Sequence, residues 1–196
     1  MTGNVENHLR QSAETTMKLL GQVDTIEEIV RLWSNALRCG CKVLFCGNGG
    51  SAADCQHLAG ELAGRFQMER QPLPALSLAS DTAILTAVGN DYGFEHVFER
   101  LVAAHGRHGD ILVAISTSGQ SGNIIRAVEK AKEMGLKVVA FTGECGRLKD
   151  MADVALCVPS SSTPRIQEAY MVAGHVICGL VEDSLFHGSG STGEEA

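Results

Sequence analysis

The chain has 196 residues, of which 44% are hydrophobic and 20% are charged. This length and balance suit one globular domain with a buried core and exclude an intrinsically disordered chain. The formal net charge is -7 and no block of Lys or Arg occurs, which argues against direct binding of nucleic acid. The N-terminus lacks the apolar run of a signal peptide, and no apolar stretch reaches the roughly 20 residues of a membrane helix. We therefore expect a cytoplasmic protein without membrane contact.

Seven cysteines are scattered along the chain without a paired CxxC spacing. The odd number and the apolar surroundings of several cysteines predict reduced thiols in the core of a cytosolic protein, not disulfides or a zinc-cysteine site.

The N-terminal part is predicted to be helical, first over residues 5–20 and then from a cap at Asp24 or Thr25 to Leu37. After Gly40, short apolar runs alternate with helical stretches. Strands are predicted over residues 42–46, 75–78, 110–115, 137–142 and 154–158. Helices are predicted over residues 51–65, 82–88, 94–105, 122–134 and 165–186, with caps at Ser51 and at Asp81 or Thr82, and with a turn at 89–93. This alternation predicts an α/β fold with a parallel sheet and helices on both faces.

A hydroxyl-rich run, Ser-Thr-Ser-Gly-Gln-Ser at residues 116–121, follows a predicted strand and precedes a predicted helix. Hydroxyl groups, a glycine and the free N–H groups of a helix start can hold a phosphate monoester without a lysine. The run is neither a Walker A loop nor a dinucleotide-binding turn. Taken alone, it could equally be a polar turn with a Ser cap.

A second strand-to-helix junction has the sequence Gly-Asn-Gly-Gly at residues 47–50. Its glycines permit positive φ and close approach of a ligand, although a tight connection alone would also explain them. Because both junctions lie at the carboxyl edge of one sheet, they favour a ligand crevice there.

Four side chains on two helices are candidates for acid–base chemistry or metal binding. His57 and Glu61 are four residues apart, so they lie on one helix face, and Arg65 is the next step. Gln167 and His175 share a broad face of the apolar C-terminal helix. If the two helices meet, His57, Glu61, Gln167 and His175 could bind a divalent ion such as zinc. Two alternatives have no catalytic role. On the first helix, His57, Glu61 and Arg65 could form a surface ladder, that is, a row of exposed side chains that pair only with one another. On the second helix, His175 could be a histidine packed in the core.

Five segments together resemble the sugar isomerase (SIS) domain family and, within it, the phosphoheptose isomerases. They are CGNGGS at 46–51, HLAGELAGR at 57–65, VGNDYGF at 88–94, GDILVAISTSGQS at 109–121, and RIQE at 165–168 followed by His175. The resemblance implies a single SIS domain over residues 1–186, with a parallel five-stranded sheet in a flavodoxin-like three-layer sandwich. It also implies that N-terminal helices within residues 1–40 serve oligomer packing and that residues 187–196 form a flexible tail.

The resemblance implies an aldose–ketose isomerase that converts D-sedoheptulose 7-phosphate to D-glycero-D-manno-heptose 7-phosphate through an enediol. The product would supply ADP-heptose for the lipopolysaccharide core. The family's acid–base pair matches Glu61 and His175, and its zinc ligands, one ion per site, match His57, Glu61, Gln167 and His175. Its substrate contacts match Asn48, Gly49, Gly50, Glu61, Arg65, Asn90, Asp91, Ser116, Thr117, Ser118, Ser121 and Gln167. The family forms homotetramers whose sites are completed by neighbouring subunits.

Two alternative functions are compatible with the same fold. A non-catalytic SIS relative binds the bacterial replication initiator and shares features such as ILTAVGN at 84–90 and the Leu185-Phe186 ending. That relative lacks the Glu and His at positions 61 and 175, and this chain keeps both, which favours the enzyme. The second alternative is an isomerase of another ketose phosphate. The one-domain length argues against the larger aminosugar synthases.

Overall fold

The computed structural model describes residues 2–186, and the predicted tail at 187–196 lies outside the described residues. Its helices are α1 (Thr2–Met17), α2 (Val23–Arg38), α3 (Gly50–Ala63), α4 (Thr82–Tyr92), α5 (Val97–His105), α6 (Gly122–Glu133), α7 (Leu148–Met151) and α8 (Thr163–Phe186), with 3-10 segments η1 (Lys18–Gln22) and η2 (Phe94–His96). Its strands are β1 (Val43–Gly47), β2 (Ala75–Ser77), β3 (Ile111–Ser116), β4 (Lys137–Gly143) and β5 (Val154–Val158).

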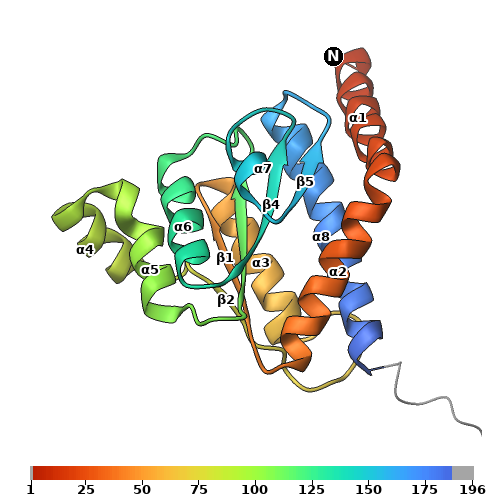
Figure 1. Ribbon diagram of the computed structural model, residues 1–196. Coiled ribbons are helices and arrows are strands. Elements are labelled where there is room, and N and C mark those ends of the chain that lie inside the picture. Colours follow the sequence, from red (N-terminus) through yellow and green to blue (C-terminus); the bar gives the residue numbers. More distant parts are fainter. Residues whose placement is uncertain (1, 187–196) are drawn as a thin grey trace, which may run out of the picture.

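The five strands form one parallel sheet in the order β2-β1-β3-β4-β5, and helices cover both of its faces (Figure 1). Successive side chains of β1 alternate between two cores. Val43 and Phe45 pack with residues of α2, α3 and α8, whereas Leu44 and Cys46 pack with residues of α5 and α6. The predicted three-layer α/β fold is therefore confirmed.

The strand order places a topological switch point between β1 and β3. The chain moves from β1 to β2 on one side, and then returns to add β3 on the other side of β1. Ligands in open parallel sheets bind beyond the carboxyl ends of strands at such a point. The 47–50 turn follows β1 and the Ser-rich run at 116–121 follows β3, so the fold brings both predicted ligand loops to this crevice.

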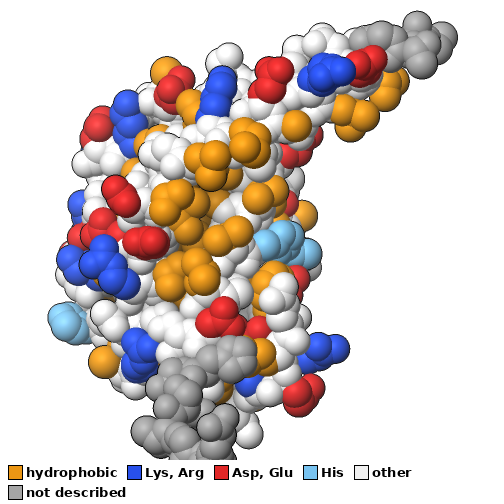
Figure 2. Space-filling view, turned by 90° about the vertical axis from the view of Figure 1, so that its right-hand side faces the viewer, with side chains coloured by type: hydrophobic (Ala, Val, Ile, Leu, Met, Phe, Trp, Pro, Cys, Tyr) orange, Lys and Arg blue, Asp and Glu red, His pale blue; other side chains and the backbone are white. Residues whose placement is uncertain are grey.

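The C-terminal helix α8 is the central helix of one face. By length and composition it is long and apolar enough to cross a membrane, and 44% of its most apolar window is buried inside the domain. Its outer side shares an exposed band of hydrophobic side chains with the N-terminal helices (Figure 2). We call this the apolar band; on α8 the exposed hydrophobic residues are Val172, Val176 and Leu180, and Leu20 of η1 and Val23 of α2 are also exposed.

Several local predictions are wrong at helix ends. The N-cap of α2 is Gln22, so neither Asp24 nor Thr25 caps this helix. The predicted turn at 89–93 is helical as far as Tyr92, because the residue that ends α4 is Gly93, with a φ of 95°. The predicted cap by Asp81 is confirmed, since its side chain accepts a hydrogen bond from the Ile84 N–H at 3.0 Å.

The start of α3 also differs from its prediction, because Gly49, with a φ of 56°, is the N-cap in place of Ser51. Ser51 lies inside the helix, where its hydroxyl bonds to another side chain. The cysteines are all free, but the prediction that they lie in the core is wrong for two of them. Cys39 and Cys145 are exposed. Each lies in a connection between a helix and a strand, Cys39 between α2 and β1 and Cys145 between β4 and α7, and not on a core-facing position.

Candidate active site between α3 and α8

Three potential proton-transfer or metal-binding groups converge where α3 crosses α8. The Nε2 atom of His57 lies 2.8 Å from the Nε2 atom of His175 and 3.1 Å from Oε1 of Glu61. The side chains of His57 and Glu61 are 48% and 22% exposed, so the cluster is partly covered and open to a ligand. The surface-ladder interpretation of this face is therefore incomplete, because the second helix contributes His175.

A glycine permits this close approach of the two helices. A Cβ atom on Gly174 would lie 2.8 Å from Cδ2 of Leu58, closer than real side chains come. A larger residue at position 174 would require the Leu58 side chain or the helix to shift, so glycine is the residue that fits this contact without rearrangement.

The cluster suits a divalent cation. One donor atom from each of His57, Glu61 and His175 lies within 4.8 Å of the other two. Two imidazole nitrogens facing each other at 2.8 Å repel unless a proton or a cation lies between them. Two histidines and a carboxylate are also a common zinc-binding set that leaves a position open for substrate.

Two contacts hold α8 in place beside the cluster. The Phe66 ring stacks on the His175 ring, with centroids 5.8 Å apart and an interplanar angle of 14°. One and a half turns before His175, the Tyr170 hydroxyl donates to Asp54 Oδ2 at 2.6 Å and lies 2.9 Å from the Ser51 hydroxyl. Burial and the hydrogen bond to Asp54 raise the pKa of Tyr170, so it remains a hydroxyl donor.

The Ser-rich run forms a compact loop between β3 and α6. The Ser116 hydroxyl lies 3.0 Å from that of Ser121, and Ser118 accepts from the Gln120 N–H at 3.3 Å. Gly119 adopts a φ of 63°, and a Cβ there would lie 2.7 Å from the Cys145 carbonyl oxygen. A cavity of about 330 Å³ adjoins the loop and is lined by Thr117, Ser118, Gly143, Glu144, Cys145, Ser160, Ser161, Thr163 and Ile166. Of the loop, Thr117 and Ser118 line this cavity, and their hydroxyl groups can donate hydrogen bonds to a phosphate group.

The two ligand loops are tied together by a pair of amides. Asn48 Nδ2 donates to Asn123 Oδ1 at 2.9 Å, and Asn123 Nδ2 donates back to Asn48 Oδ1 at 2.8 Å. Asn123, in the first turn of α6, is buried and was missed by the sequence reasoning. In the sequence, a polar residue directly after the Ser-rich run is the feature that could have indicated this contact.

The chain is similar to known proteins over most of its length. The SIS domain family model matches residues 7–143. A phosphoheptose isomerase of Rhodospirillum rubrum is 48% identical over 186 residues, 94% of this chain and 99% of its own. The phosphoheptose isomerase GmhA of Neisseria gonorrhoeae is 41% identical, with a TM-score of 0.88 over 93% of this chain and 98% of its own. A phosphoheptose isomerase structure from Francisella tularensis is 38% identical, with a TM-score of 0.89 over the same shares.

The chain belongs to the phosphoheptose isomerases of the SIS domain family. The predicted membership, and with it the prediction of an isomerase of sugar phosphates, is confirmed. The non-catalytic alternative is not favoured, since relatives that match nearly the whole chain are named as isomerases.

In this phosphoheptose isomerase, Gln167 lies apart from the three clustered donors. Its amide Nε2 would lie 2.6 Å from a Cβ on Gly50, so it packs against the start of α3. The eight residues from Gln167 to His175 correspond to about 12 Å along α8. Gln167 therefore lies beside the 47–50 turn, among the predicted substrate contacts, and its role as a fourth metal ligand stays a prediction.

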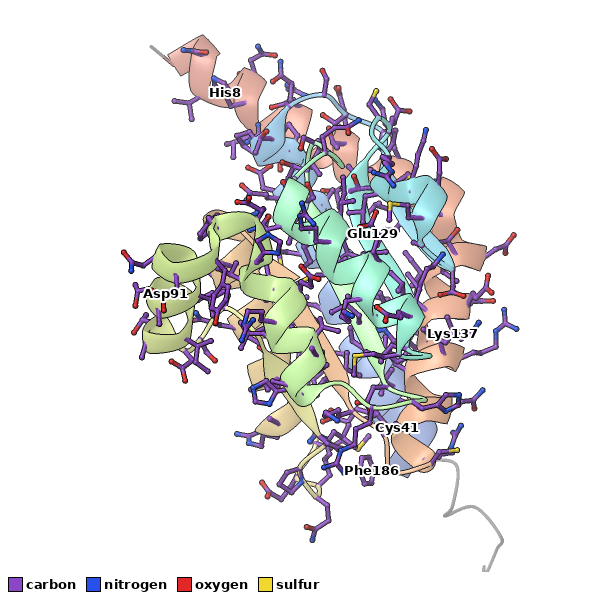
Figure 3. The ribbon with its side chains drawn as sticks, turned by 60° about the vertical axis from the view of Figure 1, so that its left-hand side comes forward. His8, Cys41, Asp91, Glu129, Lys137 and Phe186 are labelled. Carbon is purple, nitrogen blue, oxygen red and sulfur yellow. The ribbon has the colours of Figure 1, made fainter. Side chains whose placement is uncertain are left out.

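Three other predicted substrate contacts are not brought to this cluster within one chain. Asn90 and Asp91 lie on α4, in the layer on the other side of the sheet from α3 and α8, and Asp91 is far out on that arm (Figure 3). Their side chains bond to each other at 2.8 Å. The Arg65 side chain is 62% exposed and lies 3.9 Å from Glu69, not against Glu61.

Proposed function

We propose that this phosphoheptose isomerase converts D-sedoheptulose 7-phosphate to D-glycero-D-manno-heptose 7-phosphate, with Glu61 and His175 moving the protons. The observation that supports these roles is the convergence of His57 Nε2, Glu61 Oε1 and His175 Nε2 in a partly covered site. The reaction shifts one proton between two carbons and one between two oxygens, so it needs a base and an acid side by side.

The residue roles follow from the chemistry of the ketose. Glu61 removes a proton from C1 of the sugar and returns it to C2, while His175 protonates the carbonyl oxygen and accepts the proton of the other hydroxyl. Because a carboxylate has two oxygens, one can face the histidines while the other takes the proton. His57, Glu61 and His175 would hold a divalent ion such as zinc, which would supply stabilisation of the negative charge on the enediolate. Because a nitrogen that binds a cation carries no proton, His175 would act as acid only when its Nε2 is released from the ion.

The opposite end of the substrate would bind in the Ser-rich loop. Ser116, Thr117, Ser118 and Ser121 would donate to the phosphate, assisted by the positive end of α6. His57 is seven residues beyond Gly50, or about 10 Å along α3. The amide pair of Asn48 and Asn123 joins the 47–50 turn to the start of α6, beside the Ser-rich loop, so the phosphate would bind well away from the proton-transfer groups. A seven-carbon substrate with its phosphate and carbonyl at opposite ends requires such a separation. Asn48, Gly49, Gly50 and Gln167 would contact the sugar between them.

We propose that the working form is a homotetramer. The apolar band leaves Val172, Val176 and Leu180 of α8 more than 40% exposed, and association would remove this surface from water. A neighbouring copy could also supply Asn90, Asp91 or Arg65 to the site, since one chain does not bring them to it. Light scattering would test the assembly, and Val176→Glu should dissociate it. A wild-type monomer with full activity would rule this out.

The enzyme is proposed to work in the cytoplasm, where it would supply heptose for ADP-heptose and the lipopolysaccharide core. Seven free cysteines suit a reducing compartment.

A coupled assay on sedoheptulose 7-phosphate, with and without a chelator, tests the proposal directly. Chelation should abolish turnover, and zinc should restore it. A metal-free enzyme with full activity would disprove the metal role but leave the isomerisation intact. Failure to convert sedoheptulose 7-phosphate, combined with turnover of another ketose phosphate in a substrate panel, would disprove the proposed substrate.

A further inference from the structure

A buried ion pair lies at the far end of the α3–α8 contact, outside every residue assigned so far. Arg70 Nε lies 2.7 Å from Glu182 Oε1, and the two side chains are only 2% and 1% exposed. Burying two charges costs free energy, and apolar residues of similar size often stabilise a fold as well or better. The pair therefore calls for an explanation beyond stability.

Glu182 holds the loop that follows α3. Its carboxylate accepts hydrogen bonds from the backbone N–H groups of Phe66, Gln67 and Met68 at 3.1, 2.8 and 3.0 Å. Burial alone would raise the pKa of Glu182, but these three donors and Arg70 outweigh it and hold the pKa below its ordinary value. The carboxylate is thus ionised and fixes residues 66–68 on α8.

Arg70 holds the end of α3 itself. Its Nη2 donates to the backbone carbonyl of Glu61, and its Nη1 to that of Leu62, both at 2.8 Å. The last carbonyls of a helix lack partners within the helix, and a buried cation there also interacts favourably with the helix dipole. Arg70 therefore fixes the turn from which the Glu61 side chain projects.

Glu182 and Arg70 each contact a segment that touches one of the proposed proton-transfer groups, His175 and Glu61. Phe66, the first residue that Glu182 holds, stacks on the His175 ring. Gly179 leaves room for it, since a Cβ there would lie 3.3 Å from Phe66 Cε1. Glu61 is held through its own carbonyl oxygen.

We propose that Arg70 and Glu182 are positioning residues that fix Glu61 and His175 in the geometry needed for proton transfer. The kinetic part of this inference rests on the proposed function. The part that concerns the orientation of His175 does not, and can be tested without substrate or metal.

The test compares Glu182→Gln, Arg70→Lys and the double variant Arg70→Met/Glu182→Leu with Asp110→Asn. Asp110 is a matched control, because it is 2% exposed, pairs with Lys42, and accepts from the Lys42 and Arg107 N–H groups. It precedes β3, at the edge of the sheet opposite the ligand loops. Urea unfolding measures the stability of each variant.

The first readout is the NMR spectrum of the metal-free protein labelled at histidine, with His175 assigned from His175→Gln. The Phe66 ring current should shift the His175 ring protons upfield in the wild type and in Asp110→Asn. That shift should be lost in Glu182→Gln and in the double variant. In Glu182→Gln and in the double variant, the affinity for zinc, measured by calorimetry, should fall about 10- to 100-fold relative to the wild type, as for other residues that orient metal ligands.

The second readout is turnover. Glu182→Gln should lower kcat about 10- to 100-fold with KM changed less than about threefold, because misplaced groups cost rate more than binding. The double variant leaves no unpaired charge, but the backbone groups of residues 61, 62 and 66–68 lose their partners, so it should stay slow. A double variant with wild-type kcat and a wild-type His175 shift would overturn the proposal, as would an equal kcat loss in Asp110→Asn.

If Glu182→Gln does not fold, Arg70→Lys decides by the same readouts. If the wild type does not isomerise the sugar, the proposed function fails while the NMR result still decides the positioning role.

Discussion

The Nε2 atoms of His57 and His175 lie 2.8 Å apart, although 118 residues separate the two histidines in the chain. Neither α3 nor α8 alone has more than an exposed ladder or an isolated histidine. Their crossing creates a site with two imidazoles and a carboxylate. The chemistry of this isomerase therefore depends on how closely two helices pack.

The first prediction concerns the acid–base pair. Glu61→Gln and His175→Gln should each lower kcat by about 10²- to 10⁴-fold, because each removes a group that carries a proton. Both side chains are only partly buried, so urea unfolding should stay close to that of the wild type. The matched control is His105→Gln, an exposed histidine on α5, which should keep full turnover. A near-normal rate in either site variant would show that the roles are assigned incorrectly.

A second prediction concerns the phosphate end of the substrate. Ser118→Ala should raise KM about tenfold with little change in kcat, because a hydrogen bond to a charged group is worth about 1.5–3 kcal/mol and acts on substrate and transition state alike. Initial-rate kinetics on sedoheptulose 7-phosphate would measure both constants. If kcat falls instead while KM is unchanged, Ser118 lies near the reacting carbons and not at the phosphate.

Most of the fold could be predicted from the sequence, because strand and helix patterns depend on local periodicity. The five strands and the α/β class are confirmed for this reason. Helix ends were less predictable. Asp24 and Thr25 are good capping residues, but η1 runs directly into α2 and moves the cap to Gln22.

The site was only partly predictable, since its members depend on long-range packing. Spacing alone placed His57 and Glu61 on one face, but nothing in the pattern of α8 showed that His175 would turn toward them. Asn123 and the Arg70–Glu182 pair were missed because their partners lie far away in the sequence, 75 and 112 residues distant. A buried charge is recognised only when its partners are known.

The third prediction is a loss of stability at acid pH that depends on Glu182. Its folded-state pKa lies below the ordinary value of 4.5, so the carboxylate stabilises the fold fully above that pH and loses this contribution as the pH falls through the folded pKa. Urea unfolding should show the wild type more stable than Glu182→Gln at pH 7, with a gap that narrows below about pH 4.5. A gap that stays constant from pH 7 to pH 3 would show that the charge of Glu182 does not stabilise the fold.

The last prediction uses two exposed cysteines to test where phosphate binds. Cys39 and Cys145 should react first with a thiol reagent, because burial raises the pKa of Cys46 and of Cys178 to about 12. Cys145 lines the cavity beside Ser118, whereas Cys39 follows α2 at the opposite edge of the sheet. Inorganic phosphate should therefore slow the labelling of Cys145 and leave Cys39 unchanged, as measured by mass spectrometry of the peptides. Equal labelling of Cys145 with and without phosphate would place the phosphate site elsewhere, and Cys39 controls for any general effect of salt on the reagent.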